Sequence, residues 1–104
     1  MIRHIVLARF RPDVGSNEIA GVFNQLAALR GPVAGIQGFH AGASVSPEGL
    51  ERGYSHAFTV DFADANARDA YLVHPAHKEA GARLVAACAG GLDGILVMDI
   101  DISR

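Results

Sequence analysis

Two histidines and a tyrosine lie close together in the segment YLVHPAHK, residues 71–78. Pro75 fixes its own backbone and disfavours helical geometry at His74, but proline suits the first turn of a new helix, where its missing N–H has no partner to lose. The segment therefore predicts a helix that ends near Val73, a corner at His74 and a second helix that starts at Pro75. His77 then lies in a first turn, where free N–H groups and the positive end of the helix dipole disfavour an imidazolium. A neutral imidazole there can act as a base near pH 7.

Two interpretations of Tyr71 and His77 stay open from the residues alone. In the catalytic one, His77 removes a proton next to a carbonyl group while the Tyr71 hydroxyl holds the carbonyl oxygen, on which negative charge grows. In the structural one, the two side chains form a buried hydrogen-bonded pair that fixes the corner between two helices. His74 precedes the proline, and we expect it to serve the corner and not the chemistry.

The rest of the chain has the pattern of short strands and amphipathic helices. Four segments with alternating apolar residues predict strands: 2–11, 39–45, 54–62 and 95–102. Helical spacing over 16–30 predicts a helix capped by Ser16, and Asp64 is placed to cap the helix that the proline interrupts. The polar segment 46–53 predicts a surface loop. This order of elements predicts an α+β fold, the ferredoxin-like βαββαβ unit with a four-stranded antiparallel sheet and helices on one face.

The first strand is apolar on both of its faces. His4, Val6 and Phe10 share one face, and Ile5 and Leu7 lie on the other. Helices on one side of a sheet leave the second face bare, and a second copy of the chain is the simplest cover. Two such sheets packed face to face give a closed homodimer, a dimeric α+β barrel.

Composition narrows the class of protein. The 104 residues are the length of one domain, so we expect 1–104 to be a single domain, and with half of them hydrophobic the chain is globular. The net charge is −2 with scattered signs, which predicts neither a nucleic-acid partner nor a membrane surface.

No apolar run reaches the ~18 residues of a membrane span. The first residues lack a signal-peptide core, and we expect a cytoplasmic protein. Cys88 is the only cysteine, and we expect it to be a buried packing residue.

Other chemistry finds little support in the residues. The chain has no phosphate-binding loop, no dinucleotide fingerprint and no nucleophile motif. His74 and His77 have a spacing that metal sites use, but the proline separates them and no further ligand completes a set, so we expect no metal and no cofactor. Asp99 and Asp101 are expected near an edge or solvent, and His40 is expected to be exposed.

Four segments carry a family resemblance: HIVLARFRPDV at 4–14, SPEGLERGYSHAFTVDF at 46–62, AYLVHPAHKEA at 70–80 and LVMDIDI at 96–102. With them the chain resembles the stress-responsive A/B barrel domain family, a group of dimeric α+β barrels. The resemblance spans nearly the whole chain and implies the ferredoxin-like fold and a homodimer through the sheet faces. It implies no single reaction, because most members are known only as small stress- or pathway-associated proteins.

The best-understood activity in that family is a plant polyketide cyclase that closes a linear polyketide by aldol condensation. The resemblance implies that its tyrosine and histidine dyad corresponds to Tyr71 and His77, and that its further pocket histidines correspond to His4 and His56. Where the cyclase has a tyrosine on its first helix, this chain has Leu26. That difference affects the substrate more than the general chemistry.

We expect a small apolar ligand pocket between the sheet and the helices. Its expected polar groups are His4, Tyr71 and His77, with His56 either beside them or packed for structure. Its expected apolar walls are Val6, Phe10, Phe23, Leu26, Phe58, Leu84 and Met98.

Three hypotheses for the function of a protein with such a pocket stay open. The first is a stress-associated barrel protein with a small apolar or aromatic ligand and an unassigned activity. The second is a polyketide-cyclase-like or isomerase-like enzyme with His77 as its base. The third is a cofactor-independent monooxygenase of aromatic substrates, for which the sequence offers no distinctive residue.

Overall fold

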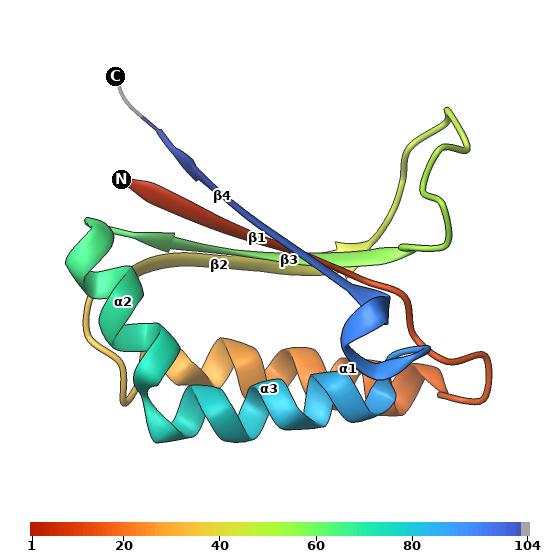
Figure 1. Cartoon of the computed structure of the whole chain (residues 1–104), viewed down its shortest axis with the longest axis horizontal. Coiled ribbons are helices and arrows are strands. Elements are labelled where there is room, and N and C mark those ends of the chain that lie inside the picture. The colour runs from red at the N-terminus through yellow and green to blue at the C-terminus, as the bar shows by residue number, and fades with distance from the viewer. Residues whose placement is uncertain (103–104) are drawn as a thin grey trace.

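The computed structural model describes residues 1–102 and shows the predicted order of elements (Figure 1). The elements are β1 (Ile2–Ala8), α1 (Ser16–Ala27), the 3₁₀ turn η1 (Ala28–Arg30), β2 (Ile36–Ala43), β3 (His56–Phe62), α2 (Ala65–Val73), α3 (Pro75–Ala87), the 3₁₀ turn η2 (Gly91–Gly94) and β4 (Ile95–Asp101). The strands form one antiparallel sheet in the order β2-β3-β1-β4. Helices α1 and α3 lie against one face of it (Figure 1). The ferredoxin-like fold is therefore confirmed.

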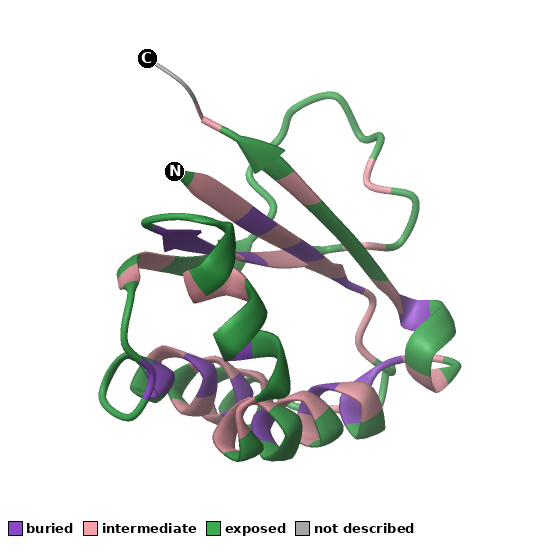
Figure 2. Ribbon diagram, turned by 60° about the vertical axis from the view of Figure 1, so that its left-hand side comes forward, coloured by how far each residue is buried: buried purple, intermediate pink, exposed green. Residues whose placement is uncertain are grey.

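The core lies between the sheet and the helices, where the buried positions of both layers meet (Figure 2). His4, Val6 and Ala8 on β1 are buried on this side, and β3 supplies Phe58 and Val60 opposite them. The faces predicted for these two strands are confirmed. The opposite face, which we call the bare face, carries no helix. Its apolar residues are Ile5, Leu7, Leu96, Met98 and Ile100. Ile5 pairs with Met98 and Leu7 pairs with Leu96, while Ile100 lies opposite Arg3.

Some element boundaries differ from the sequence-based expectation. The first strand ends at Ala8, because the backbone of Arg9 bonds to residues outside the strands. The Arg9 N–H donates to the carbonyl of Gly94 in η2 at 2.8 Å, and the N–H of Ala89, after α3, donates to the Arg9 carbonyl at 2.8 Å. The second strand starts at Ile36, earlier than predicted. Ser16 is the first helical residue of α1 and not its cap.

The corner between α2 and α3 has the predicted form. The Asp64 side chain caps α2 by accepting a hydrogen bond from the Ala67 N–H at 2.9 Å. His74 is extended, with φ −68° and ψ 134°, and Pro75 opens α3. The His74 side chain then caps α3, since its Nδ1 accepts a hydrogen bond from the Ala76 N–H at 3.0 Å. His74 thus has a structural contact at the corner.

The loop after β2 is exposed, as predicted, and extends away from the sheet (Figure 1). His40 on β2 is exposed and Cys88 after α3 is buried, both as expected. Among residues 1–102, no helix combines the length and the apolar character needed to cross a bilayer.

Candidate functional site

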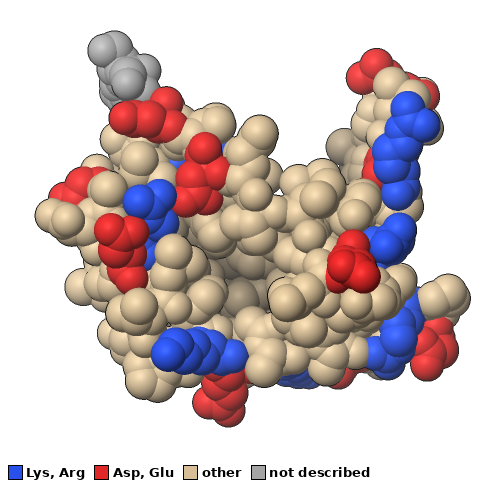
Figure 3. Space-filling view, in the orientation of Figure 1, with Lys and Arg blue, Asp and Glu red and all other residues tan. Residues whose placement is uncertain are grey.

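A cavity of about 370 Å³ lies between the sheet and α3. Figure 3 shows the molecule hollowed there, with uncharged atoms inside the hollow and charged groups around its rim. The walls are mostly apolar, which is typical of sites for small ligands. Of the residues predicted for the pocket, six line this cavity: His4, Val6, Leu26, Phe58, His77 and Leu84.

Three predicted pocket residues pack beside the cavity and do not line it. Phe10, Phe23 and His56 form an aromatic cluster at the end of the sheet. Their ring centroids are 5.2 Å apart for Phe10 and His56, 5.9 Å for Phe10 and Phe23, and 6.1 Å for Phe23 and His56. These contacts give His56 a packing role within the subunit.

The prediction that Met98 lines this cavity is wrong. Met98 pairs with Ile5 of β1 and therefore lies on the bare face, where it is 60% exposed. Val97 pairs with Val6 and lines the cavity instead. Successive side chains of a strand point to opposite faces of the sheet. The prediction exchanged the two faces of β4, so it placed every side chain of this strand on the wrong side.

Tyr71 is buried beside the cavity at the end of α2. Its ring centroid lies 4.4 Å from that of His77, 5.0 Å from that of Phe62 and 5.9 Å from that of His4. Burial raises the pKa of Tyr71 to about 12, so its hydroxyl keeps its proton. That hydroxyl has no hydrogen-bond partner among the described residues. A buried polar group without a partner costs about 1–3 kcal/mol, so this hydroxyl is an unused hydrogen-bond donor at a cost in stability.

His77 presents a neutral imidazole to the cavity. Its Nδ1 donates to the Leu72 carbonyl oxygen at 3.2 Å, and this leaves Nε2 as an acceptor. Burial is the leading cause that lowers the pKa of His77 below 6.5; the nearby His4 and His74 act in the same direction, and the Leu72 carbonyl opposes them. The lowered pKa of His77 agrees with the prediction from the sequence. That prediction attributed it to the start of a helix, whereas burial is the leading cause.

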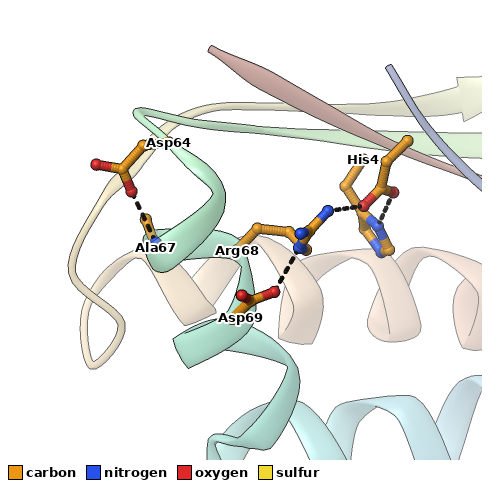
Figure 4. A network of polar contacts seen from close by, with 6 residues as sticks. His4, Asp64, Ala67, Arg68 and Asp69 are labelled. Atoms are coloured by element: carbon orange, nitrogen blue, oxygen red, sulfur yellow. Dashed lines mark hydrogen bonds and ion pairs between the residues drawn. The ribbon is translucent and has the colours of Figure 1, made fainter. Parts of the chain in front are cut away.

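A polar network that the sequence analysis did not predict holds His4. The His4 Nδ1 donates to Asp99 Oδ1 at 2.7 Å, and Arg68 Nη1 donates to Asp99 Oδ2 at 2.9 Å. Figure 4 shows Arg68 between this pair and Asp69. Burial would raise the pKa of Asp99, but the hydrogen bonds from His4 and Arg68 outweigh it and lower that pKa. An ionised Asp99 therefore fixes the His4 ring and leaves its Nε2 as an acceptor.

The sequence contained a signal for this network, the alternation of residues along β4, but the prediction placed Asp99 on the wrong side of the sheet. Asp99 lies on the edge strand β4, as expected for an edge residue, yet it pairs with His4 on β1 and faces the helices. The alternation that puts Met98 on the bare face also puts Asp99 with Val97 on the cavity side. Arg68 on α2 carried no comparable pattern.

The groups gathered at the cavity suit proton transfer. Two imidazoles line the apolar cavity and can accept a proton, and the phenol of Tyr71, buried beside the cavity, can donate a hydrogen bond. Within residues 1–102, no three His, Cys, Asp or Glu side chains lie close enough together to hold a metal ion.

Comparison with known proteins assigns the chain to a family. The family model described as Stress responsive A/B Barrel Domain matches residues 2–102. The chain belongs to this family. It is 34% identical over 98 residues to the stress-response A/B barrel domain-containing protein HS1 of Arabidopsis thaliana, covering 94% of this chain and 86% of HS1.

A solved structure and an enzyme are also similar to this stress-responsive barrel protein. A dimeric ferredoxin-like protein of unknown function from Jannaschia sp. CCS1 superposes with a TM-score of 0.89 at 34% identity, covering 97% of this chain and 98% of that one. Olivetolic acid cyclase of Cannabis sativa is 22% identical over 76 residues, which are 73% of this chain and 75% of the cyclase.

Gly81 gives a test of whether the cavity is a functional space. It lies within α3 and lines the cavity, and a Cβ added there would meet no atom within 4 Å. Glycine inside a helix costs about 0.5–1 kcal/mol relative to alanine, so Gly81→Ala should stabilise the fold by about that amount. Gly81→Leu should place a branched side chain in the cavity and weaken binding of a small aromatic ketone such as 1-tetralone. Urea unfolding and isothermal titration measure the two effects.

The matched control is Ala86→Leu, an exposed position of α3 that does not line the cavity. It should leave ketone binding unchanged. A destabilised Gly81→Ala variant, or a Gly81→Leu variant that binds as the wild type does, would contradict this description of the cavity.

Proposed function

We propose that this stress-responsive barrel protein binds a small, mostly apolar carbonyl compound and moves a proton at the carbon next to the carbonyl. The observation that carries the proposal is the contact between Tyr71, whose buried hydroxyl has no partner among the described residues, and a half-buried His77 with a lowered pKa. The structural alternative predicted a hydrogen-bonded pair, and among residues 1–102 the Tyr71 hydroxyl makes no such bond.

Each group has a distinct part in the proposed step. The Tyr71 hydroxyl donates a hydrogen bond to the carbonyl oxygen, and His77 Nε2 takes the proton from the neighbouring carbon. The C–H bond breaks, an N–H bond forms on His77, and the electron pair moves into an enolate whose oxygen faces Tyr71. His4, held by Asp99, is a second acceptor at the same cavity.

The relationship to olivetolic acid cyclase supports the class of reaction and not the substrate. Tyr71 and His77 occupy the places that the resemblance assigns to the cyclase dyad. Leu26 lines the cavity where the cyclase is expected to carry a tyrosine, so this cavity is more apolar at that point. No observation on the described residues favours a cofactor-independent monooxygenase over proton transfer, and that expectation stays a prediction.

Proton exchange of 1-tetralone in D₂O, followed by proton NMR, measures the proposed step. His77→Ala should slow the exchange by roughly 10²- to 10⁴-fold, because it removes the base. Tyr71→Phe should slow it by roughly 10²-fold or more, because it removes the donor to the enolate oxygen. It should not lower the stability of the fold, since the lost hydroxyl has no partner among the described residues.

The control is His40→Ala, which removes an exposed histidine of β2. This variant should exchange like the wild type. Wild-type exchange no faster than buffer, or an unaffected His77→Ala variant, would rule out the base. A strongly destabilised Tyr71→Phe variant would favour the structural role.

We also propose that the protein is a homodimer formed through the bare faces. Leu96 and Met98 are 49% and 60% exposed within one subunit, and with Ile100 they form an apolar strip beside Ile5 and Leu7. Adjacent exposed apolar side chains on a sheet mark an interaction surface. The related protein from Jannaschia is described as dimeric, which supports the same arrangement here.

Sedimentation velocity tests the dimer. A charge in the centre of an apolar interface lacks a partner, so Met98→Asp and Leu96→Asp should shift the protein from dimer to monomer. Val73→Asp changes an exposed apolar residue on α2 and should leave the dimer intact. A monomeric wild type, or dimers that survive both sheet variants, would exclude the bare face as the interface.

A further inference from the structure

Lys78 is the cationic residue at the edge of the cavity. It lines the cavity from the first turn of α3, directly after His77, and it is exposed. Its ammonium group makes no ion pair or hydrogen bond within residues 1–102, whereas Arg68 and Arg83 both bind carboxylates. A lysine stem covers apolar surface while its charged end stays in water, so the ammonium lies at the mouth of the cavity.

The helix itself offers Lys78 no partner. Residues three and four positions away are its neighbours on the helix surface, and none of them is acidic: His74, Pro75, Gly81 and Ala82. Glu79 is the next residue along the chain and does not share its face. No acidic side chain stands at these positions, so the charge of Lys78 is available to a ligand.

Two small residues of α3 leave space beside Lys78. Gly81 and Ala82 line the cavity next to it, and a Cβ at Gly81 would meet nothing within 4 Å. A glycine inside a helix without a packing reason lowers stability, and such local costs are typical of functional sites. Asp99 on β4 already accepts hydrogen bonds from His4 and Arg68, so it does not compete for the lysine.

We propose that the ligand of this cavity is an apolar keto acid, whose carboxylate binds Lys78 at the mouth while its carbonyl reaches Tyr71 and His77. This inference rests on the proposed function and names its substrate class. The apolar body of the ligand lies against the cavity walls, and the carboxylate stays at the rim, where it remains partly hydrated. Lys78 therefore selects acids over neutral ketones of the same shape.

Two probes of equal size test the selection: 4-oxo-4-phenylbutanoate and its neutral amide. The wild type should bind the acid about fivefold more tightly than the amide, as expected for one partly exposed ion pair. Lys78→Met should remove that preference and leave the affinity for the amide unchanged, while Lys78→Arg should keep it. Raising the salt concentration should weaken only the binding of the acid. Isothermal titration measures all of these affinities.

Arg30→Met is the matched control, because it removes an exposed positive charge at η1, away from the cavity. It should leave the preference intact. Equal affinity of the wild type for acid and amide, no binding of either probe, or an unchanged preference in Lys78→Met would overturn the inference.

The ketone exchange assay separates this result from the proposed function. Normal exchange of 1-tetralone with no Lys78-dependent preference would reject only the keto acid. A preference that depends on Lys78, without any exchange, would leave an acid-binding cavity and reject the proton-transfer step.

Discussion

The site depends on the break in the chain at Pro75. In one continuous helix, Tyr71 and His77 would lie about 9 Å apart along the axis and about 120° apart around it. The proline ends α2 and starts α3, and the rings meet with centroids 4.4 Å apart. His74 stabilises this arrangement, since its extended backbone forms the corner and its side chain caps the second helix.

The corner also explains why both groups are in unusual states. It brings a phenol and an imidazole under the sheet, where apolar neighbours remove water from them. Burial then raises the pKa of Tyr71 to about 12 and lowers that of His77. Tyr71, whose hydroxyl has no partner among the described residues, and Gly81 inside α3 both cost stability; Gly81 lines the cavity and Tyr71 is buried next to it. Local costs that gather at one place are typical of a site kept for a ligand.

Much of this arrangement was predictable from the sequence, because local rules decide it. Proline geometry gives the corner, Asp64 gives the helix cap, and alternation gives the two faces of β1 and β3. The contacts between elements were harder to predict. Alternation divides β4 into two sets of residues, but it does not say which set faces the helices. The more apolar set, which includes Met98, looks like the core, although it lies on the bare face. The same ambiguity hid the bond between His4 and Asp99.

The protonation of the His77 ring is the decisive property of this site, and long-range proton–nitrogen NMR spectra of the imidazoles measure it. The role of His77 as the base requires a ring that is neutral at pH 7, carries its proton on Nδ1 and titrates below 6.5. It also requires the chemical shift of Nε2 to change when 1-tetralone binds. A His77 ring that titrates at 6.5 or above, carries its proton on Nε2, or ignores the ketone would contradict it.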